Sequence, residues 1–139
     1  MKANSTLGLG LVSSLICGAA ATADFQGLDF KVTATDAVAA DTWTVDIYVV
    51  LDAGERLDAV AGDGSNNKQL TTSGSFYQNV FGGPTSAAIN PALIPSFPSL
   101  AYDSWVTIGL RDNVGNALSD IGIDWTGFEA GGDLWTDNG

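Results

Sequence analysis

The chain has 139 residues, a formal net charge of −11 and no histidine. Its length corresponds to about one domain, and its acidity excludes a nucleic-acid-binding role, because phosphate recognition needs a basic surface. Without histidine, the chain has neither a Ser-His-Asp triad nor the commonest transition-metal ligand.

Residues 1–23 have the layout of a secretory signal peptide. A basic second residue precedes the apolar run Leu7–Ala21, and small residues lead up to a cleavage point after Ala23. The run is short for a bilayer span, which needs about 20 residues; a membrane anchor or a buried helix is the alternative. Cleavage removes Cys17, the single cysteine, so the expected domain, 24–139, is exported without disulfides.

Two segments, Leu28–Ala34 and Thr42–Leu51, alternate apolar and polar residues as strands do. Asp36–Asp41 lies between them, so we expect an antiparallel hairpin. We expect the apolar face, with Trp43 in particular, to pack on a core while the other face meets water. The expected inner face comprises Leu28, Phe30, Val32, Ala34, Trp43, Val45, Ile47, Val49 and Leu51.

Further short strands are expected around two turn clusters, Asp63–Asn67 and Asp112–Asn116. The proline-rich segment Ser86–Pro98 is expected to pack down on the domain, with one helical turn within Ile89–Ile94. The additional strands are expected at Leu57–Ala61, Gln69–Thr72, Trp105–Leu110 and Ile121–Trp125.

These elements predict an all-β fold, an antiparallel β-sandwich or jelly-roll-like single domain over 24–139. The strands are few for two full sheets, so partner strands come either from another copy or from a missing segment of the chain. The last nine residues are as typical of a strand end and turn as of a frayed tail, and truncation of the domain at its C-terminus stays open.

Loops rich in Asp, Asn and Gly are candidates for a calcium site, because Ca²⁺ takes roughly six to eight oxygen ligands. The same residues form ordinary β-turns, which is the alternative, and no loop carries the bidentate Glu of an EF-hand. The candidate ligands are Asp63, Asn66, Asp112, Asn113, Asn116, Asp133 and Asp137.

Aromatic residues provide a second candidate site, since four Trp and three Tyr are many for so short a chain. Exposed rings on a β-sheet face stack on sugars, and Trp105, Tyr102 and Tyr77 are the candidates. The alternative for Trp105 is a position in the core beneath the proline-rich loop.

Paired carboxylates are the remaining route to catalysis, since no nucleophile elbow, P-loop or dinucleotide motif is present. A glycosidase needs two carboxyl groups at a defined separation, which the sequence does not fix. The acidic residues considered for this role are Glu55, Glu129, Asp103 and Asp124.

Three strings lie in the second half of the chain: GSFYQ at 74–78, GGPT at 82–85 and YDSWVTIG at 102–109. They resemble a segment of secreted acidic β-domain proteins of marine and planctomycete-like bacteria. The resemblance covers most of the domain and implies a signal peptide followed by an acidic β domain, in some members with a C-terminal anchoring segment. It implies no catalytic residues.

Export, acidity and the missing catalytic motifs favour a non-catalytic extracellular structural or adhesive module of a surface layer, matrix or filament, which self-associates. The alternative is a carbohydrate-binding module of a secreted degradative system, with extracellular polysaccharide as its partner. A carboxylate-based glycosidase is the third interpretation. We expect no nucleic-acid partner, no membrane span after residue 23 and no cofactor other than calcium.

Overall fold

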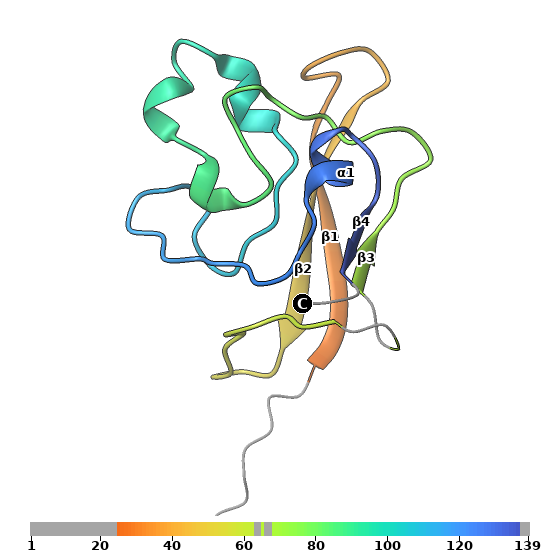
Figure 1. Ribbon diagram of the computed structural model, residues 1–139, viewed down its shortest axis with the longest axis vertical. Coiled ribbons are helices and arrows are strands. Elements are labelled where there is room, and N and C mark those ends of the chain that lie inside the picture. Colours follow the sequence, from red (N-terminus) through yellow and green to blue (C-terminus); the bar gives the residue numbers. More distant parts are fainter. Residues whose placement is uncertain (1–24, 63–64, 66–67, 137–139) are drawn as a thin grey trace, which may run out of the picture.

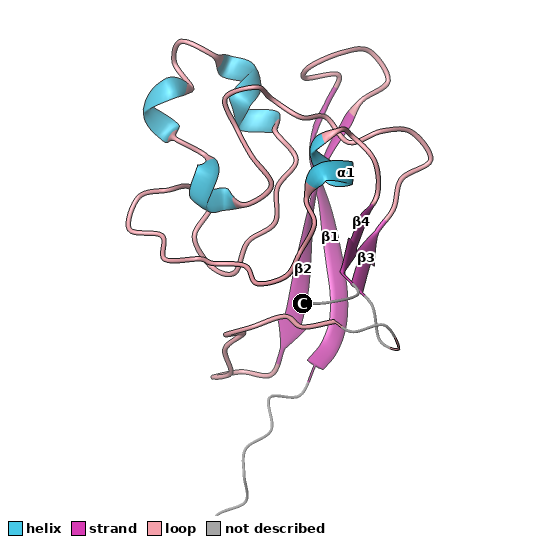
Figure 2. Ribbon diagram, in the orientation of Figure 1, coloured by secondary structure: helices cyan, strands magenta, loops and turns pink. Residues whose placement is uncertain are grey.

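A computed structural model describes residues 25–62, 65 and 68–136 (Figure 1). Residues 1–24, with the expected leader, and the candidate ligands Asp63, Asn66 and Asp137 lie outside this part. The described chain is a small β-rich domain with short helices (Figure 2). Its elements are β1 Phe25–Thr35, β2 Trp43–Leu51, β3 Lys68–Leu70, three 3₁₀ turns at Ser86–Ala88, Pro91–Leu93 and Pro98–Tyr102, α1 Thr126–Glu129, and β4 Leu134–Thr136.

The two long strands form the predicted antiparallel hairpin, hereafter the ribbon. Phe30 pairs with Ile47, and Val32 with Val45, so their side chains share a face. An irregularity after Val32 then shifts the register, so that Ala34 pairs with Thr44 on the opposite face from the one expected.

The connection of the ribbon is closed by its own polar groups. The Asp36 amide donates to the Thr42 carbonyl at 2.8 Å, and the Asp36 carboxylate accepts from the Asp41 amide at 2.7 Å. Asp36 and Asp41 both have positive φ, 53° and 60°. Aspartate tolerates this left-handed region better than most residues, which explains its use at both positions.

The expected orientation of the ribbon is wrong, because its apolar face is the uncovered one. Trp43, expected in the core, is 66% exposed. In β2 the polar-face residues Thr44 and Asp46 are half-buried, whereas Val45 and Ile47 are exposed. Further along, Tyr48 and Val50 of the polar face are at least as exposed as Val49 of the apolar face. The polar face therefore meets the rest of the domain around Thr44 and Asp46.

The second sheet joins distant parts of the chain. β3 pairs antiparallel with β4, with Gln69 opposite Trp135. The expected pairing of Gln69–Thr72 back onto Leu57–Ala61 is wrong, since 57–61 is not a strand. Figure 1 shows β3 and β4 side by side as a short sheet.

Two further expected strands are absent from the described chain. Trp105–Leu110 contributes one isolated parallel bridge, between Val106 and Thr85, and Gly109 then turns the backbone away with φ +90°. Ile121–Trp125 is interrupted by Gly122 with φ +78°. Glycine reaches this region without steric cost, and one such residue ends an extended segment.

The core lies mainly in the loop-rich half, hereafter the lobe, formed by residues 71–133. Leu100 and Phe128 are fully enclosed, Ile89 is nearly so, and Leu134 at the start of β4 adds to the core. The proline-rich segment packs down as expected, and its helical turn is confirmed at Pro91–Leu93. There the Asn90 side chain accepts from the Ala92 amide at 3.0 Å.

Candidate functional site

The three sequence strings converge on one buried carboxylate, Asp103, which is 7% exposed. Its Oδ1 accepts from the Asn79 amide at 2.7 Å, and its Oδ2 accepts from the Gly83 amide at 3.0 Å. Asp103 follows the last 3₁₀ turn, whose end directs it into the loop 79–83. A carboxylate that accepts two backbone N–H groups fixes a loop that has no strand or helix of its own.

Asn79 extends this network in the opposite direction. Its Nδ2 donates to Ser99 Oγ at 2.9 Å and to the Tyr77 hydroxyl at 3.2 Å, and its Oδ1 accepts from the Phe81 amide at 3.0 Å. The Ser104 amide donates to the Tyr77 carbonyl at 3.0 Å. Asn79 and Asp103 thus join segments that are more than twenty residues apart.

A short backbone ladder continues from this centre. The Val106 amide donates to the Pro84 carbonyl at 2.9 Å, and the Ser86 amide donates to the Val106 carbonyl at 3.0 Å. Ser86, fully buried, donates through Oγ to Thr107 Oγ1 at 2.7 Å. The residues of the three strings are therefore packing and hydrogen-bonding residues of the lobe.

Two carboxyl groups near this centre have perturbed acidity. Burial raises the pKa of Asp103, and its effect exceeds that of the backbone amides, which act in the opposite direction. Burial also raises the pKa of Glu129, and the charge of Asp103 adds to the effect. The oxygens of Asp103 accept bonds from backbone amides, whereas Glu129 is exposed and its charge repels that of Asp103.

The raised pKa values of Asp103 and Glu129 predict the dependence of stability on pH. A raised folded-state pKa means that the folded chain holds protons that the unfolded chain has released, so stability falls as pH rises through that range. We therefore expect the urea concentration at the unfolding midpoint to be higher at pH ~5 than at pH 7. Arg111 lowers the pKa of Asp46, so the contribution of Asp46 is lost only below its usual 3.8.

The variant Glu129→Gln isolates this effect. It removes the repulsion on Asp103, so its urea midpoint should be higher than that of the unaltered chain at neutral pH and should change less with pH. Asp52→Asn, at an exposed residue, is the control. A midpoint that falls from pH 7 to pH ~5, or an equal effect of the two variants, contradicts the assignment.

The described candidates for calcium ligands take part in hydrogen bonds within the chain. Asp112 Oδ1 accepts from the Val114 amide at 2.9 Å, and Asn116 Nδ2 donates to the Asp112 carbonyl at 2.8 Å. The Asn113 amide donates to the Ile89 carbonyl at 2.8 Å, and Asp133 Oδ1 accepts from the Thr72 amide at 3.1 Å. Among residues 25–62, 65 and 68–136, no three acidic side chains gather closely enough to hold a metal ion.

The aromatic candidates Tyr77, Tyr102 and Trp105 are all half-buried in the lobe. The Arg111 guanidinium lies over the Trp105 ring, 5.5 Å from its centroid, as a cation–π contact. One face of this ring is thus occupied by the protein itself. The hydroxyl of Tyr77 accepts the bond from Asn79, which ties this residue to the network around Asp103.

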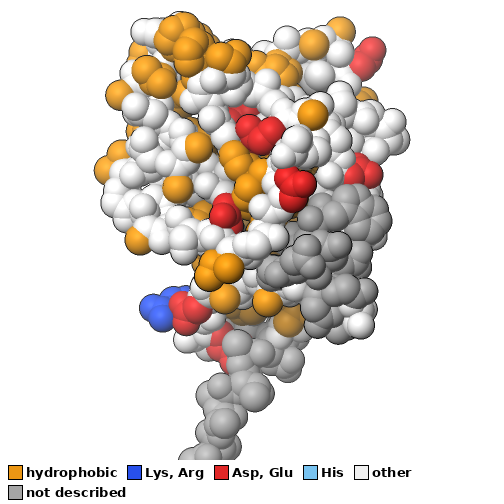
Figure 3. Space-filling view, in the orientation of Figure 1, with side chains coloured by type: hydrophobic (Ala, Val, Ile, Leu, Met, Phe, Trp, Pro, Cys, Tyr) orange, Lys and Arg blue, Asp and Glu red, His pale blue; other side chains and the backbone are white. Residues whose placement is uncertain are grey.

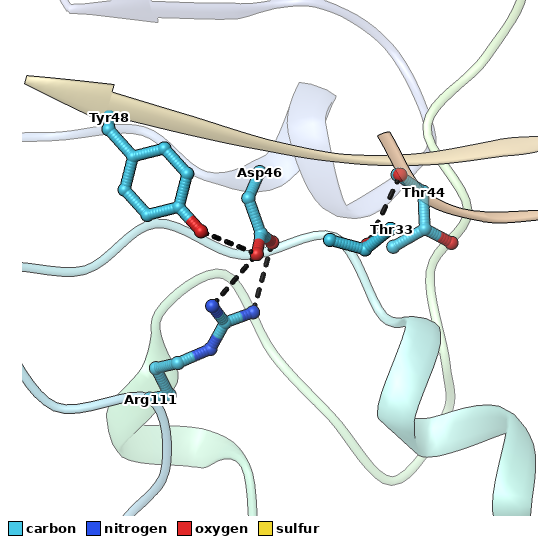
Figure 4. A network of polar contacts seen from close by, with 5 residues as sticks. All are labelled: Thr33, Thr44, Asp46, Tyr48 and Arg111. Carbon is cyan, nitrogen blue, oxygen red and sulfur yellow. Dashed lines mark hydrogen bonds and ion pairs between the residues drawn. The ribbon is translucent and has the colours of Figure 1, made fainter. Parts of the chain in front are cut away.

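Arg111 is also the residue that holds the ribbon to the lobe. Its two terminal nitrogens donate to the Asp46 carboxylate at 2.8 and 2.9 Å, and Tyr48 donates to the same carboxylate at 2.9 Å (Figure 4). Sequence reasoning missed this pair. The sequence contains a clue to this pair: Asp46 lies on the polar face of a strand, and the chain has only five cationic residues that could neutralise it.

The surface around these contacts is mixed in character. Figure 3 shows acidic side chains dispersed over one face, with hydrophobic side chains exposed over the region of the helical turns. An apolar hollow of about 520 Å³ lies where Phe25, Leu28 and Val49 of the ribbon meet 57–61. The hollow is continuous with the apolar face of the ribbon through Leu28 and Val49.

None of the helices in the described part of the chain has the length and hydropathy of a membrane span. The chain was also compared with protein-family models, with curated proteins and with solved structures. None of the three comparisons finds a match, so the argument about function depends on the geometry of the Asp103 centre and of the ribbon.

Proposed function

We propose that the chain is a secreted, non-catalytic structural or adhesive module of an extracellular assembly. The single observation that carries the proposal is the uncovered apolar face of the ribbon. Monomeric proteins in water rarely leave a contiguous apolar face of this kind exposed, and such faces mark interaction surfaces. In this interpretation the lobe is the scaffold and the ribbon carries the interaction surface.

The acid–base properties of the chain also favour a non-catalytic role. Asp103, whose pKa is raised by burial, is enclosed and bonded to backbone amides. Trp105, the foremost sugar-stacking candidate, is covered on one side by Arg111. A substrate at Asp103 or a sugar on the covered face of Trp105 would therefore have to displace contacts that stabilise the fold.

The two-layer sandwich expected from the sequence becomes part of this proposal. Within one chain, the described strands form two separate two-stranded sheets, β1–β2 and β3–β4. A two-stranded ribbon alone is marginal in water and needs a further layer over its apolar face. An assembly supplies that layer from outside the chain.

To test the proposal, the full chain with residues 1–23 is expressed in a secreting host, and its location and assembly state are measured. We expect it outside the cell, starting at Asp24 by intact mass, and forming particles larger than one chain in sedimentation and electron microscopy. Polysaccharide turnover is measured in parallel and is expected to be absent. Retention in the cell with the leader intact, or turnover that is lost in Glu129→Gln, overturns the proposal.

A further inference from the structure

The apolar side of the ribbon is defined by the strand register. Leu28 lies opposite Val49, Phe30 opposite Ile47, and Val32 opposite Val45, with Trp43 continuing the same side beyond Val45. Directly paired residues share a face of a sheet. We call these seven residues the ribbon face; they are Leu28, Phe30, Val32, Trp43, Val45, Ile47 and Val49.

The ribbon face is uncovered because the other side of the ribbon is used for attachment. Arg111 holds Asp46 on the polar side through two bonds, and the Asp46 side chain is only 18% exposed. The ribbon cannot turn its apolar residues onto the lobe without breaking this ion pair. All seven residues of the ribbon face are 36–72% exposed.

The area of the ribbon face is sufficient for a small dimer interface. At their exposed fractions, Phe30 and Trp43 alone present on the order of 300 Å², since an aromatic side chain has about 150–250 Å². The five aliphatic residues add a comparable area. Two copies would together bury about 1,200 Å², the lower end of the range for stable protein–protein interfaces.

We propose that the ribbon face packs against the ribbon face of a second copy of the chain, giving a two-layer β-sandwich across a twofold axis. The inference deepens the proposed function and rests on it for the role of the assembly. A twofold contact brings the same patch of both copies together, so the patch must be complementary to itself. None of the seven residues is charged, so the copies bring no like charges together at its centre.

Charge elsewhere on the chain opposes this contact and therefore predicts a signature. The full chain carries a net charge of −11, and removal of 1–23 takes away Lys2, so two copies repel at long range, and salt screens that repulsion. A dimer held by apolar area alone therefore tightens as sodium chloride is raised. A partner bound by charge complementarity would instead be released by salt.

The test is sedimentation equilibrium of the leader-processed chain, with two substitutions at neighbouring residues. Val49→Lys places a charge on the ribbon face, and Val50→Lys places the same charge on the opposite face of the same strand. The two valines are 36% and 40% exposed, so both variants should fold, which far-ultraviolet circular dichroism checks. Lysine also lowers the net negative charge, so general repulsion cannot explain a lost dimer.

We expect Val49→Lys to raise the dimer dissociation constant at least roughly tenfold, because two lysines are desolvated per dimer, and Val50→Lys to change it little. We also expect the dimer of the unaltered chain to tighten with salt. If both variants, or neither, weaken association, the ribbon-face dimer is overturned, but the proposal of a self-associating module still stands. A chain that is monomeric throughout overturns both. If the chain dimerises through the ribbon face but stays in the cell, the proposed extracellular function is overturned and the ribbon-face dimer holds.

Discussion

Gly82→Ala is expected to unfold the lobe or to lower its stability by about 3 kcal/mol or more. A Cβ atom at position 82 would overlap the Asp103 carboxylate, which is held in place by the amides of Asn79 and Gly83. The carboxylate has no room to move, since it is buried. Either the loop or the buried acceptor must give way, and two amides then lose their partner. Urea unfolding followed by tryptophan fluorescence measures the effect.

Gly74→Ala is the matched control. A Cβ at position 74 would meet no atom within 4 Å, and the backbone there does not have positive φ. This variant should be neutral or slightly stabilising, because alanine restricts the unfolded chain. Equal midpoints for the two variants would show that loop 79–83 is not closed on Asp103.

Phe128→Ala is expected to cost about 3–5 kcal/mol, a large part of the stability of a small domain. The ring is 2% exposed and packs against Phe76, with centroids 5.2 Å apart, and against Trp125 at 6.2 Å. Truncation removes these contacts and leaves a cavity. The Phe128 carbonyl also accepts from the Gln78 side chain at 2.9 Å, so movement of α1 loosens a second segment.

Val80→Ala provides the comparison for this substitution, because Val80 is 89% exposed. Its unfolding midpoint should be close to that of the unaltered chain. Phe128→Leu should lie between the two, since it keeps part of the buried volume. If Phe128→Ala and Val80→Ala unfold at the same urea concentration, the core of the lobe does not lie around α1.

The hairpin was predictable because its information is local. Alternation over Leu28–Ala34 and Thr42–Leu51 predicts both strands, and the short connection leaves only an antiparallel pairing. The direction in which the apolar face points was not predictable from alternation. It depends on contacts between residues distant in sequence, such as the bond of Arg111 to Asp46, which spans 65 residues.

The lobe was predicted poorly for a related reason. Val106 and Ile108 alternate like strand residues, yet the chain there pairs at one bridge only and turns at Gly109. Alternation of apolar and polar residues indicates which side chains are buried. A partly buried irregular loop can show the same alternation as a strand of a sheet. Asp103 was considered only as a catalytic carboxylate, because nothing in its sequence neighbourhood predicts which amides it meets.

The pairing of β3 with β4 has a kinetic consequence. β1 and β2 are joined by a short turn, so the ribbon can form in microseconds once both strands are free. β3 and β4 are separated by the whole lobe, and a closure of that length bears a larger entropic cost, so we expect it late in folding. The ribbon face is therefore expected to form while the lobe is still open, so chains at high concentration would pair through it before either lobe closes.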